Sequence, residues 1–260
     1  MPRERGRATA HPPGQTLQLD LAAPALARAR VYDFLSLAFL YPFSGTVAQL
    51  RQTGEAVAAG DFPEGLRKAA ESALRILKTM EDDALVEEFI RVFGHGVPKD
   101  CPPYETEYGQ AHIFQKTHAI ASLTAFYQAF GVKLNPEIKD RPDHLGVELE
   151  FMQVLARKEA YCLQRAGTEE QLQICRDAQR AFLSDHLAPW VQSFARRVTR
   201  KAGQASAYWS LAVVLEHHIN NETALFRLPM SRDRGPMPQE EPETDGCAFD
   251  QAAAVGGGTT

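Results

Sequence analysis

The stretch Arg141-Pro142-Asp143-His144-Leu145-Gly146-Val147-Glu148-Leu149-Glu150-Phe151-Met152 decides how the middle of this chain folds. Pro142 disfavours a helix before it, and Asp143 is a good N-cap for a helix that starts just after it. His144 and Glu148 are four residues apart, so they share one face of that helix. Apolar residues recur at helical spacing on another face, which turns inward: Leu145, Leu149, Met152 and Leu155/Ala156. We therefore predict an Asp-His pair displayed at a helix start above an apolar body.

The same helical period extends over almost every ordered segment of the chain. Apolar stripes of period 3.6 cover Val31–Phe39, Leu66–Leu77, Val86–Phe93, Ile120–Phe130, Leu172–Leu183, Val191–Val198 and Tyr208–Ile219. Thr168 with Gln171 forms a capping box, Gly94 is a predicted C′ glycine, and Val47–Ala58 is a weaker helix interrupted by Gly54. No window alternates in the manner of a strand. The sequence predicts an all-α fold, a single domain of about eight to ten helices, with a division into two subdomains left open.

Composition sets the expected domain boundaries. Residues 1–20 are rich in Pro, Gly and Arg and are predicted to be a mobile N-terminal arm, whereas residues 21–228 form the helical domain. Residues 229–260 form an acidic, glycine-ended tail that offers too little apolar surface to fold, so we predict disorder there. The long loop Gly94–Tyr104 is of a length that is often functional inside a helical domain.

Charge and apolar runs exclude several classes of protein. The formal net charge of −5 argues against nucleic acid as a partner, since nucleic-acid binding calls for a strongly basic surface. No run approaches 18 apolar residues, and the basic N-terminus is followed by no apolar core of an export signal. The four cysteines show no C-x-x-C pair, which favours reduced thiols. We expect a cytoplasmic protein without a membrane span.

The common enzyme signatures are absent. The sequence has no phosphate loop, no Gly-x-Gly-x-x-Gly, no Gly-x-Ser-x-Gly, no His-Glu-x-x-His and no Glu-x-x-His. A metal site is the sharpest enzymatic alternative, because His144 with Glu148 and His218 with Glu222 are both i,i+4 pairs. If the two helices faced each other, these four side chains would converge on one ion. Alternatively, His218 lies near a helix C-terminus, where imidazolium is favoured, and Glu148 is a solvated partner.

The loop Cys101-Pro102-Pro103-Tyr104-Glu105-Thr106-Glu107-Tyr108 combines two prolines, two tyrosines and two carboxylates. A rigid apolar ledge beside acidic groups would suit a peptide that carries arginine. Ordinary loop packing, with the tyrosines at the edge of the core, explains the same residues. The aromatic run Phe126–Phe130 is more typical of core than of a groove.

Taken together, these residues resemble the TorD/DmsD/NarJ family of redox-enzyme maturation chaperones. The resemblance covers roughly residues 28 to 222 in order. It rests on these elements: Tyr32…Leu35-Ser36…Phe39-Leu40-Tyr41-Pro42, Phe89…Phe93-Gly94, the Pro-Pro-Tyr-Glu loop, Phe126-Tyr127…Phe130-Gly131, Pro142-Asp143-His144-Leu145…Glu148-Leu149…Phe151-Met152, and His186-Leu187…Trp190…Phe194. The loop looks most like that of chaperones serving type II dimethyl sulfoxide reductase-like enzymes.

The resemblance implies a role that the residues alone do not reveal. Such proteins bind the N-terminal, usually twin-arginine, signal segment of a molybdopterin-containing catalytic subunit and hold it until the cofactor is inserted before export. They are not redox enzymes themselves, and we expect no cofactor in this chain. In the family, the Pro-Asp-His element contributes to peptide binding, which carries over to Pro142, Asp143 and His144. Guanine-nucleotide binding is not carried over, because the chain lacks a phosphate loop.

We therefore predict a chaperone that takes the apolar part of a signal peptide in a groove and offers carboxylates to its arginines. The predicted peptide-binding residues are Pro142, Asp143, His144, Glu148, Tyr104, Glu105, Glu107, Tyr108 and Phe93. A homo-oligomer is compatible with the sequence. Two alternatives remain open: the metal-dependent helical-bundle enzyme described above, and a helical scaffold that binds apolar peptides without regard to arginine.

Overall fold

The computed structural model describes residues 13–94, 100–109, 113–134, 140–165 and 167–229. Within these residues the chain forms nine α-helices, a 3-10 turn and a π turn, with no strand beyond an isolated bridge, so the all-α prediction is confirmed. The elements are α1 (Pro13–Phe39), α2 (Thr46–Ala58), α3 (Glu64–Leu77), α4 (Asp82–Phe93), η1 (Glu105–Glu107), α5 (Ile113–Ala129), α6 (Leu145–Gln164), α7 (Glu169–Phe182), η2 (Leu183–Leu187), α8 (Val191–Ala202) and α9 (Ala207–Leu225).

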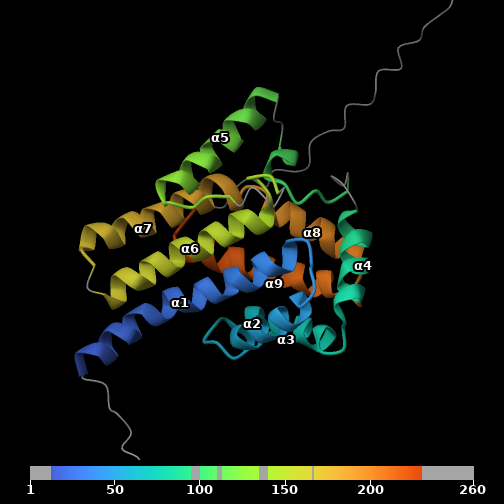
Figure 1. Cartoon of the computed structure of the whole chain (residues 1–260), viewed down its shortest axis with the longest axis horizontal. Helices are drawn as coiled ribbons and strands as arrows, with labels where there is room; N and C mark the ends of the chain where they lie inside the picture. Colours follow the sequence, from blue (N-terminus) through green and yellow to red (C-terminus); the bar gives the residue numbers. More distant parts are fainter. Residues whose placement is uncertain (1–12, 95–99, 110–112, 135–139, 166, 230–260) are drawn as a thin grey trace, which may run out of the picture.

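The helices pack around a central antiparallel pair. Helices α1 and α6 lie side by side through the middle of the molecule, and α7 packs against α6 (Figure 1). The α2–α3 pair covers one side of α1, and α9 packs on α3 and α8. Helix α5 stands on the opposite side of the molecule from α2 and α3 (Figure 1). The start of α6 and the η1 turn therefore meet on the side where α5 attaches.

Aromatic rings form two clusters in the core. One cluster joins α1, α4, α8 and α9 through edge-to-face and stacked contacts among Phe39, Phe89, Phe93, Phe194 and Tyr208. The other joins α5, α6 and α7 through Phe126, Tyr127, Phe151 and Phe182. Each such pair adds about 0.5–1.5 kcal/mol beyond the apolar area that it buries. The run Phe126–Phe130 thus belongs to the core, as its pattern indicated.

Two sequence signals for helix ends are confirmed, and one helix differs from its prediction. Thr168 and Gln171 exchange the two hydrogen bonds of a capping box at 3.1 and 3.2 Å. Gly94 follows α4 with a positive φ of 72°, the conformation that glycine adopts most readily. Helix α2 is not interrupted at Gly54. That residue is buried, and an added Cβ would lie 3.0 Å from both Leu74 and Phe34, so the glycine permits close helix packing.

The first helix begins earlier than the sequence analysis placed it. Helix α1 starts at Pro13 and accommodates Pro24, so residues 13–20, which the sequence analysis placed in the N-terminal arm, are helical. Leu17, Gln18 and Leu19 in this segment are good helix formers, which the Pro- and Gly-rich residues before them obscured. Residues 1–12 and 230–260 lie outside the described residues. The predicted domain boundaries and the predicted tail therefore stay predictions.

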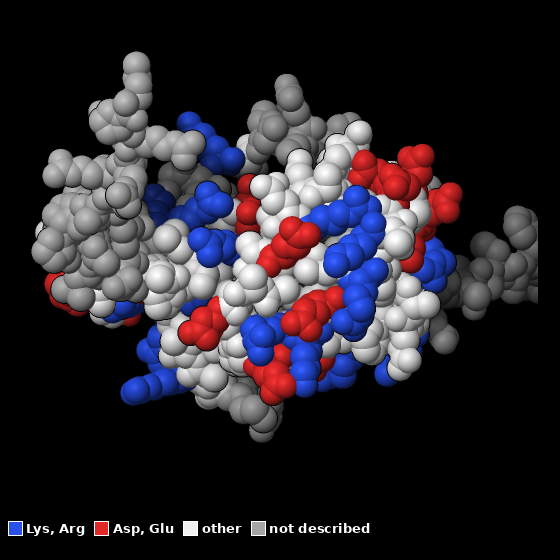
Figure 2. Space-filling view, turned by 90° about the horizontal axis from the view of Figure 1, so that it is seen from below, with Lys and Arg blue, Asp and Glu red and all other residues white. Residues whose placement is uncertain are grey.

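Charges of both signs share the face that α2 and α3 present. Figure 2 shows Lys and Arg side chains in a band beside Asp and Glu side chains, rather than one continuous basic surface. Such a mixed face does not make the single-sign field that nucleic-acid binding requires. In the described part of the chain, no helix is both long enough and apolar enough to cross a membrane.

Candidate peptide-binding site

The loop that carries Tyr104–Tyr108 is joined to the start of α6 by backbone hydrogen bonds. Tyr104 and His144 form an isolated antiparallel bridge. The Glu105 amide donates to the Asp143 carbonyl at 2.9 Å, and the Leu145 amide donates to the Pro103 carbonyl at 2.8 Å. We call this region, residues 103–108 and 141–148, the loop–helix junction. It brings together all the predicted peptide-binding residues except Phe93.

Asp143 is buried in the junction rather than displayed. Its side chain is fully shielded from solvent, with 0% exposure. Arg141 donates to both carboxylate oxygens of Asp143, at 2.9 and 2.7 Å, and the Thr106 hydroxyl donates to Oδ2 at 2.8 Å. The predicted N-cap role of Asp143 is wrong, because Arg141 and Thr106 take up its carboxylate and the helix begins one residue later.

The N-cap of α6 is His144. Its Nδ1 accepts a hydrogen bond from the Gly146 amide at 3.1 Å, so the proton of the neutral ring is assigned to Nε2. Burial lowers the pKa of His144 below its usual value, although the neighbouring Asp140 and Asp143 charges oppose this shift. The neutral imidazole caps the helix through its lone pair, and Tyr104 packs edge-on against it with ring centroids 5.2 Å apart. His144 is therefore positioned as a structural cap beside Tyr104.

Glu105 is buried and paired with a histidine from the π turn. His186 Nδ1 lies 2.9 Å from Glu105 Oε2, and His186 Nε2 lies 3.3 Å from the Ser122 hydroxyl of α5. The π turn η2 directs His186 inward just ahead of Pro189, which has no amide hydrogen to continue a helix. This chain of contacts ties the junction to α5 and α7.

Glu148 lies one turn into α6 and has no compensating charge. It is fully buried, and neither carboxylate oxygen has a hydrogen-bond partner among the described residues. Burial raises its pKa well above the usual value, and the nearby carboxylates of Glu105 and Asp143 raise it further, while the Trp190 side chain opposes the shift in part. Burial therefore favours the neutral, protonated form of Glu148, which is not the solvated partner considered from the sequence.

Replacing Glu148 with glutamine should stabilise the fold at neutral pH. The usual pKa of Glu is about 4.3, so above that pH the unfolded chain releases the Glu148 proton, whereas the folded protein retains it. The free energy of unfolding of the wild type therefore falls as the pH rises toward the pKa of Glu148 in the folded protein. Glutamine is of similar shape and carries no titratable proton. We expect a higher melting temperature for Glu148→Gln at pH 7 and a gap that closes near pH 4. An equal gap at both pH values, or a less stable variant at pH 7, would contradict the buried neutral acid.

The remaining predicted residues divide into buried and partly exposed groups. Tyr108 and Phe93 are core side chains, with Tyr108 packed on Trp190 at 5.0 Å between ring centroids and Phe93 in the aromatic cluster of α4. Tyr104, Glu107 and Pro142 are partly exposed and form the outer edge of the junction. Any peptide that meets the junction in this conformation would therefore meet Tyr104 and Glu107 before the buried carboxylates.

Sequence reasoning did not assign a role to three polar side chains of the site. Arg141 and Thr106 hold Asp143, and His186 holds Glu105. A signal for Arg141 was present, since an arginine two residues before a buried aspartate can turn back on it across a proline. No local pattern distinguishes His186, because its partner is 81 residues away in the sequence.

The metal-site alternative is not supported by the geometry. Glu222 accepts hydrogen bonds from Arg28 at 2.8 and 3.0 Å and from the Tyr32 hydroxyl at 2.9 Å, and His218 packs edge-on against Tyr32. Glu148 instead lies beside Glu105 and Asp143. Among the described residues, no three His, Cys, Asp or Glu side chains are grouped to hold a metal ion.

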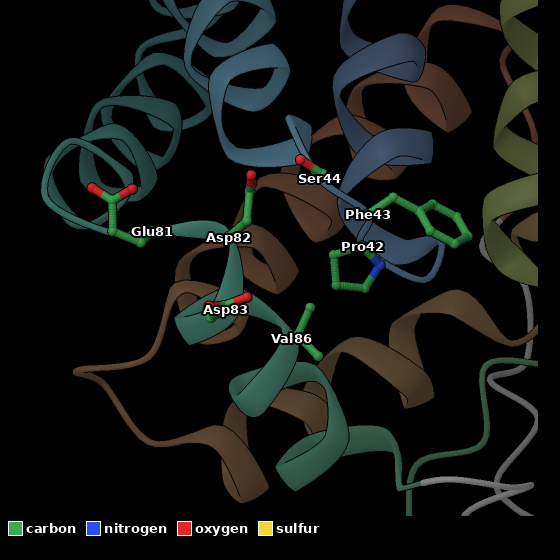
Figure 3. Close-up of a pocket in the computed structure, with 7 residues that line it drawn as sticks. All are labelled: Pro42, Phe43, Ser44, Glu81, Asp82, Asp83 and Val86. Atoms are coloured by element: carbon green, nitrogen blue, oxygen red, sulfur yellow. The ribbon is translucent and has the colours of Figure 1, made fainter.

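A shallow pocket lies away from the junction, between the α1–α2 turn and the start of α4. It encloses about 320 Å³ and is lined by Pro42, Phe43, Ser44, Glu81, Asp82, Asp83 and Val86 (Figure 3). Figure 3 shows the Asp82 side chain pointing toward Ser44, and its carboxylate accepts from the amides of Gly45 and Val47 at 2.6 and 2.9 Å. These backbone hydrogen bonds lower the pKa of Asp82. Asp82 thus has a structural role at the N-terminus of α2.

The fold and the junction define an all-helical protein with a buried acidic site, and comparison assigns its family. Residues 59–196, more than half of the chain, match the model of the nitrate reductase delta subunit family, so the chain belongs to that family. This confirms the resemblance seen in the sequence.

Individual relatives carry more specific names. The chlorate reductase assembly chaperone protein of Ideonella dechloratans is 38% identical over 79 residues, which are 30% of this chain and 39% of that protein. The perchlorate reductase assembly chaperone protein of Dechloromonas aromatica is 28% identical over 189 residues, 68% of this chain and 80% of that protein. The chaperone protein TorD of Vibrio cholerae is 26% identical over 142 residues, 53% of this chain and 62% of that protein. The first and third matches thus span less than two thirds of those relatives.

Proposed function

We propose that this protein is an assembly chaperone that binds the N-terminal signal segment of a molybdopterin-containing oxidoreductase subunit. It acts in the cytoplasm and holds this subunit, its client, back from export until the client's cofactor has been inserted. Relatives named as assembly chaperones for chlorate and perchlorate reductases support the proposal. Its action is binding alone, and we propose that it catalyses no reaction.

One structural observation supports a location for the bound peptide on this protein. Tyr104 and Glu107 form a partly exposed edge beside the buried carboxylate of Asp143, at the one junction that joins the predicted peptide-binding loop and helix. The side chain of Glu107 is 24% exposed and has only partial cover from Lys116 and Arg141, at 3.2 and 3.4 Å. An arginine-bearing peptide finds an accessible carboxylate and an aromatic ring there.

Titration with three peptides tests the function. The probes are a synthetic signal segment from the molybdoenzyme catalytic subunit of the same genome, a variant with Lys-Lys in place of Arg-Arg, and a variant with its apolar stretch made polar. We expect clear binding only when both the arginines and the apolar stretch are present. Equal affinity for all three peptides would favour the non-specific scaffold, and no binding of the intact segment would reject the proposal.

The Glu107→Gln variant tests whether the peptide binds at the junction. A charge-assisted hydrogen bond contributes roughly 1.5–3 kcal/mol, so leader affinity should fall about ten- to a hundredfold. Glu71→Gln is the matched control, because Glu71 is an exposed carboxylate on α3, a helix that lies on the opposite side of the molecule from α5 (Figure 1). Asp143→Asn is a poorer probe than Glu107→Gln, since it also disturbs the internal pairing of Asp143 with Arg141. Equal affinities of the Glu107 variant and the wild type would remove Glu107 from the site.

A further inference from the structure

The side chain of Arg141 lies in a set of groups that suits a guanidinium ion. Its Nε and Nη2 bond both oxygens of Asp143, and Nη2 also donates to the Thr106 hydroxyl at 2.7 Å. Its Nη1 lies 3.4 Å from Glu107 Oε1, and its Cζ lies 4.4 Å from the centre of the Tyr104 ring. We call the four residues Tyr104, Thr106, Glu107 and Asp143 the guanidinium cradle.

The cradle matches the shape and the charge of an arginine head group on every side. A planar fork pairs with a carboxylate through two parallel hydrogen bonds, and its flat face stacks on an aromatic ring. The cradle supplies both, together with a second carboxylate and a hydroxyl. A lysine ammonium is a point charge that makes neither the two-point pairing nor the planar stacking. The cradle is thus selective for arginine over lysine.

Arg141 occupies the cradle from its outer side. Its side chain is 35% exposed, whereas that of Asp143 is 0% exposed. It reaches Asp143 from two residues away along a turn, in which the His144 amide donates to the Arg141 carbonyl at 3.0 Å. The guanidinium can therefore leave toward solvent without passing through the core. Because Asp143 is buried, its charge is costly when no cation is in place.

We propose that the cradle is a receptor for an arginine side chain of the bound signal segment, and that Arg141 fills it in the free protein. An incoming arginine displaces Arg141 into solvent, so one guanidinium replaces another beside Asp143. Arg141 keeps the cradle formed in the free protein. Because Arg141 occupies the cradle, it also lowers the apparent affinity for the arginine of the peptide. This inference rests on the proposed function for the source of the arginine, but the cradle itself is testable without any client.

The client-free test uses the Arg141→Ala variant, which empties the cradle. Its melting temperature should be below that of the wild type and should rise when millimolar methylguanidinium or N-acetylarginine amide is added. Methylammonium at the same concentration should have no such effect, and methylguanidinium should stabilise the wild type less than it stabilises Arg141→Ala, because Arg141 competes for the cradle. Arg75→Ala is the matched control, since Arg75 is an exposed arginine on α3. If methylguanidinium stabilises Arg141→Ala no more than it stabilises the wild type or Arg75→Ala, the cradle is not a receptor.

The second test measures competition. If Arg141 fills the cradle roughly nine-tenths of the time, Arg141→Ala should bind the twin-arginine peptide about tenfold more tightly than the wild type. Should the alanine variant fail to fold, Arg141→Lys keeps a cation in place with poorer geometry and should also bind the peptide more tightly. Unchanged or weaker peptide affinity in the folded variant overturns the displacement. Rescue by methylguanidinium without any peptide binding would keep the cradle and reject the proposed function.

Discussion

Replacement of Arg28 with alanine is expected to lower the free energy of unfolding by about 3–5 kcal/mol, because it leaves the buried carboxylate of Glu222 without its cation and removes one of the two cations that pair with Glu159. The guanidinium of Arg28 pairs with Glu222 at 2.8 Å and with Glu159 at 3.0 Å. Gln179 also contacts it, and the Tyr32 hydroxyl shares Glu222 at 2.9 Å. Both carboxylates are buried. This network joins α1, α6, α7 and α9, so its loss loosens four helices at once.

Chemical denaturation followed by circular dichroism measures this effect. Arg30→Ala is the matched control, because Arg30 is exposed on the same helix only two residues away. Burial by itself lowers the pKa of Arg28, but the Glu222 and Glu159 charges outweigh it and raise the pKa, so Arg28 stays charged throughout the accessible pH range. A loss for Arg28→Ala no larger than that for Arg30→Ala would contradict the view that the pairing compensates the buried charges.

Trp190→Ala is expected to destabilise the protein by a similar amount, about 3–5 kcal/mol, through the cavity that it leaves. Trp190 is fully buried and contacts Tyr108 and Phe194, with ring centroids 5.0 and 5.7 Å away. Tyr108 belongs to the loop of the junction, so the indole supports that loop from beneath. Peptide affinity should therefore fall together with stability.

The controls separate packing from other effects. Trp190→Phe keeps an aromatic ring and should lose distinctly less stability than Trp190→Ala. Trp209→Ala removes the other tryptophan of the chain, which is only partly buried, and should also lose less. Unfolding is followed by circular dichroism, since both variants change the fluorescence. A loss below about 1 kcal/mol for Trp190→Ala would show that the loop does not depend on this contact, because full cavity formation costs several times more.

The fold could be predicted from the sequence because helical period is a local property. Apolar residues at helical spacing, as in Val31–Phe39, identified the helices. Gly94 and Thr168 marked helix ends, and each such signal involves only residues within about one helical turn of that end. Gly54 shows the limit of local reading. The low helix propensity of glycine suggested an interruption. In the structure the glycine instead allows α2 to pack closely against Phe34 of α1 and Leu74 of α3.

The sequence grouped the loop and the helix start in one candidate site, and it did not predict the burial of their side chains. The sequence indicated that the Pro-Pro-Tyr-Glu loop and the Pro-Asp-His element matter, and the structure brings them together. A carboxylate at a helix start is usually an exposed cap, and that expectation failed for Asp143 because Arg141 and Thr106 compensate its burial. Similarly, no local pattern around Glu148 reports Glu105 or Trp190, which act on it in space but are distant from it in the sequence.

The central claim is that the signal segment binds at the loop–helix junction, and hydrogen exchange with and without the peptide tests it most directly. Saturating twin-arginine peptide should slow exchange at the amides that bond across the junction, those of Glu105 and Leu145, and in the flanking residues 104–108 and 144–148. The pocket at residues 42–44 and 81–86 is the internal comparison. Protection of the junction with little change at the pocket is the predicted result. Protection confined to the pocket, with unchanged exchange at Glu105 and Leu145, would contradict the account.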